Sequence, residues 1–152
     1  MTIRLSPDEA WDVLDRAHTG ILTTLRRDGM PISLPVWFTV VGRTICLVVP
    51  AQTKKVARIR NDPRASFLVE SGERWAELRA VHLTGIVEVV DDAELHKTID
   101  EQIERKYAAY RTPRSDMPDG ARRHYAERTF LRLVPDQRIL SWDNCRLTLS
   151  RR

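Results

Sequence analysis

The basic residues within PAQTKKVARIRNDPR, residues 50–64, are the side chains whose type and spacing first suggest chemistry. Thr53 is in the N-cap position of a short predicted helix, Lys54 and Lys55 lie in its first turn, and Arg58 follows one turn later. A helix N-terminus carries about +0.5 elementary charge, so cations are unfavourable there. Like charges four residues apart add a penalty of a few tenths of a kcal/mol. These cations are therefore unfavourable together unless a further interaction stabilises them.

A bound anion would stabilise these cations. A phosphate at the start of a helix over residues 53–61 would be attracted by free backbone N–H groups, by the helix dipole and by the ammonium groups. The hydroxyl of Thr53 could add a further hydrogen bond. The alternative is a solvated basic face, with the helix stabilised by its cap and by core contacts of Val56 and Ile59. The segment alone favours neither interpretation.

Other catalytic signatures are missing from the sequence. It contains no phosphate-binding G-x-x-x-x-G-K-[ST] loop, no G-x-G-x-x-G and no G-x-S-x-G. No two histidines are spaced i, i+4 as metal ligands on a helix often are, and acidic pairs near helix starts are explained as caps. We therefore predict no metal site and no hydrolase mechanism. The histidines are His18, His82, His96 and His124.

Length and composition predict one globular domain over residues 1–152. The hydrophobic share is 42%, the charged share is 30%, and the net charge is +4 with a pI of about 9.4. No apolar run is long enough to cross a bilayer, and the N-terminus lacks a secretory signal, so no membrane partner is expected. Cys46 and Cys145 form no C-x-x-C motif, which suits a reducing, cytoplasmic location.

The first half of the chain predicts a helix followed by strands. Ser6, Pro7 and Glu9 give a capping box and a favoured first position to a helix over residues 6–17. Asp28-Gly29 lies between two β-rich runs and is a strong hairpin signal. The predicted strands are 20–27, 30–40 and 44–49, and the basic helix follows them.

The second half adds strands and two more helices. Gly85 interrupts a long β segment over residues 75–90, as expected for a bulge where a sheet curls into a barrel. Asp91 and Glu94 suggest a capping box for the next helix. The predicted elements are a strand over 64–71, a helix over 91–110, a basic loop over 111–120, a short helix over 121–128, and strands over 129–135, 138–143 and 146–150. Six or more strands in meander order predict a mainly β (α+β) barrel with flanking helices.

These segments together resemble the pyridoxamine 5′-phosphate oxidase-like split β-barrel family. The resemblance is carried by GILTTLRRDGMPISLPVWF, TKKVARIRNDPRASFLVE and RWAELRAVHLTGIVEVVDD, and it covers roughly residues 6–110. A weaker match lies at RILSWDN. The pattern [ST]-[RK]-K…NDPR, placed after three strands, is its most specific part. The chain looks most similar to the branch of flavin and deazaflavin oxidoreductases that use coenzyme F420.

The resemblance implies a cofactor groove between the two barrels of a homodimer. The start of the basic helix would hold the cofactor phosphate, and a strand would run along the tricyclic ring with its backbone groups facing the pyrimidine edge. One tryptophan near the C-terminus would line the same groove, whereas packing is the preferred explanation for Trp75. The residues assigned to the cofactor in this way are Thr53, Lys54, Lys55, Arg58, Pro35, Val36, Trp37, Phe38 and Trp142.

The activity implied by the resemblance is hydride transfer between reduced coenzyme F420 and a small organic substrate that the sequence does not identify. The cofactor carries such chemistry, so no catalytic triad is required and no catalytic residue is assigned. An FMN-dependent oxidase or reductase of the same fold is the alternative, because FMN also presents a phosphate. The YRTPR stretch resembles a piece found in the deazaflavin branch and favours F420.

Two further questions stay open at the level of sequence. Cations of the basic loop could contact the polyglutamate tail of coenzyme F420 or an acidic substrate, or they could simply be solvated; they are Arg111, Arg114, Arg122 and Arg123. A basic barrel that binds nucleic acid is a competing hypothesis, since such proteins combine a positive groove with stacking aromatics. The aromatic share is only 7% and the tryptophans are not interleaved with the basic run, which disfavours it.

Overall fold

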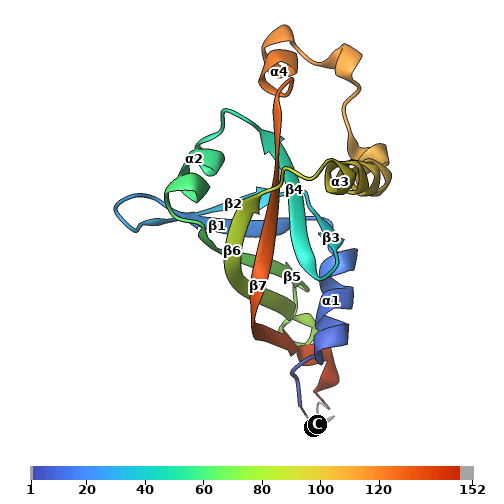
Figure 1. Ribbon diagram of the computed structural model, residues 1–152. Coiled ribbons are helices and arrows are strands. Elements are labelled where there is room, and N and C mark those ends of the chain that lie inside the picture. The colour runs from blue at the N-terminus through green and yellow to red at the C-terminus, as the bar shows by residue number, and fades with distance from the viewer. Residues whose placement is uncertain (1, 148–152) are drawn as a thin grey trace.

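Seven antiparallel strands form one curled sheet in the computed structural model, which describes residues 2–147. The strand order is β2-β1-β5-β6-β7-β4-β3, which differs from the predicted meander because β5 pairs with β1 and β7 pairs with β4. The sheet curls into a half-barrel (Figure 1). The strands are β1 Gly20–Leu25, β2 Pro31–Val36, β3 Thr39–Val41, β4 Thr44–Pro50, β5 Arg64–Ser71, β6 Arg79–Val89 and β7 Arg128–Asp143. The predicted split β-barrel is confirmed.

Four α-helices of the described residues lie around this sheet. They are α1 Pro7–Arg16, α2 Lys54–Asn61, α3 Ala93–Tyr107 and α4 Asp119–His124. In Figure 1, α2 and α3 lie on opposite sides of the central strands, and α4 lies on an arm at the end of the molecule away from both termini. None of the helices in residues 2–147 is long and apolar enough to cross a membrane.

Local sequence signals explain the first elements. The Ser6 hydroxyl accepts the Glu9 N–H while the Glu9 carboxylate accepts the Ser6 N–H, so the predicted capping box begins α1. Gly29 has a φ of 82° in the turn that joins β1 to β2, a conformation that glycine adopts without steric cost. The β1–β2 hairpin places this turn as predicted.

The predicted irregularity in the sheet lies next to Gly85, and its extra residues are on β7, where residues 136–138 face Thr84 alone. The register between β6 and β7 shifts between Leu83 and Gly85, and a Cβ atom on Gly85 would lie 2.2 Å from the carbonyl oxygen of Val134. A larger side chain would push the two strands apart at this point. The strand β7 runs through this bulge as one long strand, where the sequence predicted two strands, 129–135 and 138–143.

Other sequence predictions are corrected in their details. The segment 75–78 begins with a short 3-10 helix, Trp75–Glu77, instead of a strand. The helix α3 is capped by Asp92, whose carboxylate accepts the Leu95 N–H, and not by Asp91. The short helix predicted over 121–128 begins earlier, as α4. Of the last predicted strand, 146–150, only Arg146 and Leu147 lie within the described residues, at the end of a 3-10 helix, Asn144–Arg146.

The strand predicted over residues 30–40 is broken at Trp37 and Phe38, and the cause is the end of α3. Tyr107 is fully buried, and its hydroxyl oxygen accepts the Phe38 N–H at 3.0 Å and lies 2.7 Å from the His18 carbonyl oxygen, to which it donates. The Lys106 ammonium donates to the Phe38 carbonyl at 3.0 Å. These side chains take the backbone bonds that a continuous strand would offer to a neighbour.

Burial of Lys106 has an electrostatic consequence. Its Nζ lies 3.9 Å from the centre of the Phe38 ring. Desolvation lowers the pKa of Lys106 from its ordinary 10.5 to about 8, and the charge of Asp15 opposes this shift.

Replacing Tyr107 by Phe removes the hydroxyl but keeps the buried ring. The Phe38 N–H and the His18 carbonyl then lose a buried partner, so we expect the free energy of unfolding to fall by about 1–3 kcal/mol. Urea denaturation monitored by circular dichroism measures this. Tyr110→Phe is the matched control, because Tyr110 is 64% exposed, and its expected change is within about 0.5 kcal/mol. Equal losses in the two variants would contradict the assigned role.

The Lys106 shift predicts a pH dependence of stability. Because its pKa is lower in the folded chain than in the unfolded chain, the unfolded state binds more protons between about pH 8 and 10.5, and stability rises with pH across that window. Between neutral pH and pH 10, the free energy of unfolding of wild type should therefore rise by on the order of 1 kcal/mol relative to that of Lys106→Met. Urea titrations of both proteins at the two pH values test this, and a constant difference would refute it.

Candidate functional site

The helix α2 is fixed on the barrel by its two apolar residues. Val56 is 1% exposed and Ile59 is 3% exposed, and both belong to the main hydrophobic core. The helix packs beside β1 (Figure 1). Its orientation leaves Lys54 exposed and holds Lys55 and Arg58 half-buried at the protein surface. The predicted basic face therefore exists, with two of its three cations partly withdrawn from water.

Thr53 occupies the N-cap position of α2 without acting as a side-chain cap. Its backbone is extended, with φ −78° and ψ 151°, but its hydroxyl makes no capping hydrogen bond. The Oγ1 atom is buried and has no hydrogen-bond partner among the described residues. A buried hydroxyl without a partner costs free energy, so this atom is arranged as an unused donor or acceptor beside the helix start.

The two half-buried cations lie near one another. Burial lowers the pKa of Lys55, and the positive charge of Arg58 lowers it further. The Arg58 Nε donates a hydrogen bond of 2.8 Å to the Thr24 Oγ1 on β1. Among the salt bridges of residues 2–147, none involves these cations or the exposed Lys54. The charge at this helix start is therefore uncompensated within the described chain.

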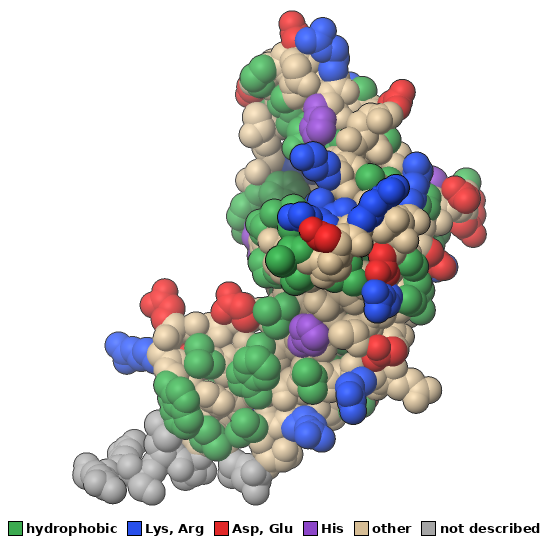
Figure 2. Space-filling view, turned by 90° about the vertical axis from the view of Figure 1, so that its left-hand side faces the viewer, with side chains coloured by type: hydrophobic (Ala, Val, Ile, Leu, Met, Phe, Trp, Pro, Cys, Tyr) green, Lys and Arg blue, Asp and Glu red, His purple; other side chains and the backbone are tan. Residues whose placement is uncertain are grey.

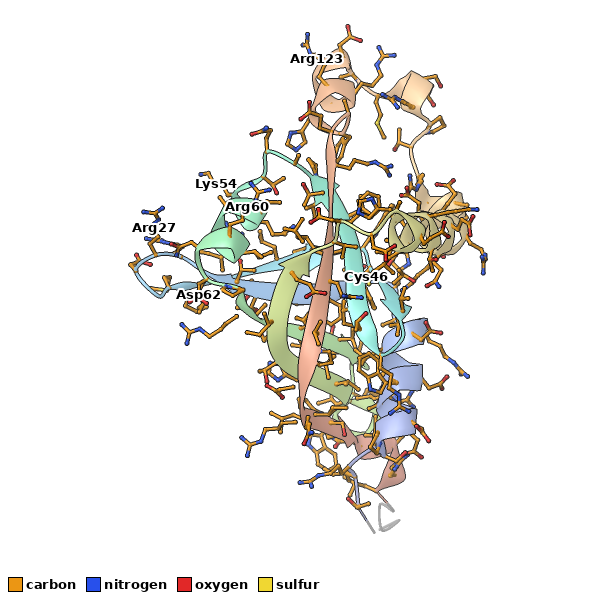
Figure 3. The ribbon with its side chains drawn as sticks, in the orientation of Figure 1. Arg27, Cys46, Lys54, Arg60, Asp62 and Arg123 are labelled. Carbon is orange, nitrogen blue, oxygen red and sulfur yellow. The ribbon has the colours of Figure 1, made fainter. Side chains whose placement is uncertain are left out.

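This arrangement is suited to binding an anion. The first backbone N–H groups of a helix have no intrahelical acceptor, and here they follow Thr53, whose hydroxyl is buried without a partner, in the turn that carries Lys54 and Lys55. Figure 2 views the side of the molecule that carries α2, where Lys and Arg side chains gather across the middle. Figure 3 shows Lys54 and Arg60 on α2 and Arg27 at the nearby hairpin tip. A phosphate group fits this set of donors and charges.

The segment predicted to accompany a cofactor ring occupies the end of β2. Val36 pairs with Gly20 across the sheet, and Pro35 pairs with Ile21. Trp37 is 37% exposed and stacks on Tyr107, with ring centres 4.3 Å apart and planes 8° apart. Phe38 is fully buried, and both its N–H and its carbonyl are engaged by the end of α3. The role of this segment toward a cofactor stays a prediction.

Trp75 and Trp142, the two tryptophans considered for the groove, lie near the C-terminal end of β7 and away from α2 of the same chain. Trp142 pairs with Ala80 at the C-terminal end of β7, which Figure 1 shows at the opposite end of the molecule from α4. Trp75 is 61% exposed, and its carbonyl accepts a 2.7 Å hydrogen bond from the Asn144 amide. The structure does not bring Trp142 to the basic helix of the same chain, so a shared groove would require a second copy.

The basic loop carries its cations partly in ion pairs. Arg111 lies 3.4 Å from Glu104, and Arg122 pairs with Asp119 within α4. Arg114 and Arg123 have no salt bridge among the described residues, and Figure 3 shows Arg123 on the projecting arm, separate from Lys54 on α2. A role for this loop toward an anionic tail stays a prediction.

The outer face of the sheet presents apolar side chains. Register places Ile21, Leu68, His82 and Leu140 in one row across β1, β5, β6 and β7, on the side opposite the buried core. Leu140 is 54% exposed. Farther along this face lies a groove of about 710 Å³, lined in part by Leu25, Ile86 and Val134. The other three residues of this row, Ile21, Leu68 and His82, are half-buried, so the row forms a partly exposed, mainly apolar surface.

Metal-binding groups and reactive thiols are two other kinds of centre that could carry chemistry in the described chain. Within residues 2–147, no group of three His, Cys, Asp or Glu side chains could hold a metal ion. Cys46 is buried on β4 and Cys145 is exposed, and both are free thiols. Burial raises the pKa of the Cys46 thiol, which keeps it protonated and unreactive.

Three residues that support the predicted site residues were not identified from the sequence: Thr24, which bonds to Arg58, and Lys106 and Tyr107, which bond to Phe38. The alternation in GILTTL places Leu22 and Thr24 on the same inward face, so an inward threonine was a signal available in the sequence. The contacts of Lys106 and Tyr107 with Phe38 join residues more than sixty positions apart and had no sequence signal.

Solved structures with this fold include a conserved hypothetical protein of Mycobacterium tuberculosis, Rv2991. It is 29% identical with a TM-score of 0.82, over 99% of this chain and 92% of that chain. An FAD-binding protein of Mesorhizobium loti is 18% identical with a TM-score of 0.70, over 93% and 94% of the two chains. An F420 reductase is 21% identical with a TM-score of 0.65, over 89% and 98%. The last two likenesses show the fold alone.

Family membership follows from a sequence match that includes both the barrel and the basic helix. Among curated proteins, none matches the chain significantly. The family model described as pyridoxamine 5′-phosphate oxidase matches residues 6–138, a span that contains six complete strands and all four α-helices. The chain belongs to the pyridoxamine 5′-phosphate oxidase family.

Proposed function

We propose that this protein is an oxidoreductase that binds coenzyme F420 with its phosphate at the start of α2 and acts on a small organic substrate. The observation that carries the proposal is that one short helix combines the half-buried Lys55 and Arg58, which make no salt bridge in the described chain, with an unpartnered Thr53 hydroxyl at its N-cap. When bound, the reduced coenzyme would supply the hydride, and the protein would supply binding, orientation and exclusion of water.

The chain would contribute residues to two ends of the proposed site, one for the phosphate and one for the ring. Thr53, Lys55 and Arg58 would hold the phosphate, with Lys54 adding a solvent-exposed charge. Val36 and Trp37 would run beside the ring, and the contacts of Tyr107 and Lys106 with Phe38 would keep that segment fixed. Rigid placement of the two ends would set the position of the reacting ring relative to a substrate.

FMN is the second candidate cofactor, because it carries a phosphate that the same donors would bind. The family match and the FAD-binding relative are compatible with a flavin. The F420 reductase among the structural relatives and the YRTPR stretch favour the deazaflavin. Separate titrations with the two coenzymes distinguish the candidates.

We also propose that the functional unit is a homodimer formed through the outer face of the sheet. Leu140 and Trp142, which are 54% and 39% exposed, would be buried against a second copy together with the half-buried Ile21 and Leu68 of the same row. Such packing would allow Trp142 of one copy to approach a groove formed with the other. A monomer would leave this apolar surface in water at a cost of about 25 cal/mol per Å².

The coenzyme proposal predicts opposite effects of Lys55→Ala on binding and on stability. Loss of a charge-assisted contact should weaken coenzyme F420 binding by roughly 10- to 100-fold, measured by coenzyme fluorescence. Thermal stability without ligand should be unchanged or higher, because a half-buried cation next to Arg58 is removed. Parallel FMN titrations identify the preferred cofactor.

Lys97→Ala is the matched control, because Lys97 is an exposed lysine on α3. It should change coenzyme affinity by less than about two-fold. Absence of binding of both coenzymes to wild type, or unchanged affinity in Lys55→Ala, would refute the proposal. Steeply salt-dependent binding of DNA or RNA in their place would support the basic nucleic-acid-binding alternative.

The dimer proposal predicts that Leu140→Asp produces a monomer. A carboxylate at this position would have to be desolvated in the interface, which costs several kcal/mol by an order-of-magnitude estimate. Size-exclusion chromatography with light scattering measures the mass of both proteins. Met30→Asp changes an equally exposed apolar residue, also 54% exposed, at the hairpin turn and should leave the dimer intact. A monomeric wild type would contradict the proposal.

A further inference from the structure

Thr24 is a buried polar residue on a face of β1 that otherwise packs into the core. It is 1% exposed, and its strand neighbour on the same face, Leu22, is also 1% exposed. A hydroxyl at such a position is unfavourable unless it has a hydrogen-bond partner, and valine would fill nearly the same volume without that requirement. The 2.8 Å hydrogen bond from Arg58 Nε supplies the partner.

This hydrogen bond uses only one edge of the Arg58 guanidinium. The group has about five N–H donors in a fixed planar fork, and Nε carries one of them. Among the side-chain hydrogen bonds of residues 2–147, the bond to Thr24 is the single one made by Arg58. The terminal nitrogens of the fork therefore make no side-chain hydrogen bond in the described chain, while the bond to Thr24 restricts the orientation of the guanidinium.

Orientation matters because an arginine recognises a phosphate through two parallel hydrogen bonds. Such bidentate contacts require a defined plane, and a freely rotating side chain would lose conformational freedom on binding. A carboxylate that orients an arginine also neutralises its charge. A neutral threonine hydroxyl orients Arg58 without cancelling its charge, which keeps the charge for an external anion.

We infer that Thr24 is a positioning residue of the α2 anion site: its hydroxyl holds Arg58 so that the free guanidinium nitrogens receive the phosphate of the bound coenzyme. The inference rests on the proposed function, because it takes that phosphate to be the anion. It adds to the site a residue of β1 that lies thirty-four positions from Arg58 in the sequence. Thr24 itself does not touch the ligand.

The test replaces the hydroxyl without changing the shape of the residue. In the full-length protein, Thr24→Val should weaken binding of coenzyme F420, or of FMN if that is the preferred cofactor, by about ten-fold. Thr24→Ser restores the hydroxyl and should recover affinity to within about three-fold of wild type. Coenzyme fluorescence gives the dissociation constants, and circular dichroism melting verifies that each variant is folded.

Thr23→Val is the matched control. Thr23 is the adjacent residue on the opposite face of β1, where its hydroxyl bonds to Ser33 at 2.7 Å. It should leave coenzyme affinity unchanged. Equal weakening in Thr23→Val and Thr24→Val would mean that strand stability, and not the orientation of Arg58, is responsible, and would overturn the inference.

A double-mutant cycle with Arg58→Ala separates positioning from a structural effect. If Thr24 acts through Arg58, Thr24→Val should have no further effect on affinity in the Arg58→Ala background. Additive losses would overturn the inference. The Arg58 Nε–H resonance provides a readout in the protein without coenzyme: it should be protected from solvent exchange in wild type and Thr24→Ser, and exposed in Thr24→Val.

Failure of this inference is distinguishable from failure of the proposed function. If wild type binds a coenzyme but Thr24→Val binds it equally well, only the role of Thr24 is overturned. If wild type binds neither coenzyme, the proposed function is overturned. Titration with inorganic pyrophosphate then tests whether Thr24 orients Arg58 toward another phosphate ligand. A shift of the Arg58 Nε–H resonance that requires the Thr24 hydroxyl would support positioning for another phosphate ligand, whereas an unmoved resonance would overturn it.

Discussion

Burial of Val56 and Ile59 in the barrel core is the constraint on which the candidate site depends. It fixes α2 against β1, and the helical geometry then places Lys55 and Arg58 at the protein surface, where water is only partly accessible. Hydrophobic burial thus stabilises an electrostatic arrangement that would be unfavourable by itself. The pKa of Lys55 is lowered because the cation is half-buried and lies near the positive charge of Arg58.

A second cluster of contacts controls the other end of the proposed cofactor site. The hydroxyl of Tyr107 and the amine of Lys106 bind the backbone of Phe38 and end β2 at Val36. The chain can then turn into β3 instead of continuing along β1. The break leaves Trp37 partly exposed and stacked on a buried ring, so a segment of backbone that would otherwise be paired is directed by side chains of α3.

The two regions are built on different physical principles. At α2 the structure leaves charge and a hydroxyl unsatisfied, which is the usual state of a site prepared for a ligand. At the end of β2 the polar groups of Phe38 are satisfied, which is the usual state of a supporting element. This division agrees with a protein that binds and orients a group carrying its own chemistry, and it explains why no catalytic triad is expected.

The sequence by itself determined the local elements and the chemical character of α2. The capping box of Ser6 and Glu9, the Asp28-Gly29 turn, the bulge at Gly85 and the grouping of Lys54, Lys55 and Arg58 all follow from short-range rules. Together with the family resemblance, these signals also gave the split barrel, because turn chemistry and periodicity act over a few residues.

Only the tertiary structure decided the features that join distant residues. The hydrogen bond between Arg58 and Thr24, the interruption of the 30–40 segment by Tyr107, and the continuity of β7 past Pro135 depend on packing between elements. The sequence showed that a hydroxyl lay on the inward face of β1 but not which side chain it would meet. Local propensity fixes which strand or helix forms, whereas long-range contacts fix where each polar group finds its partner.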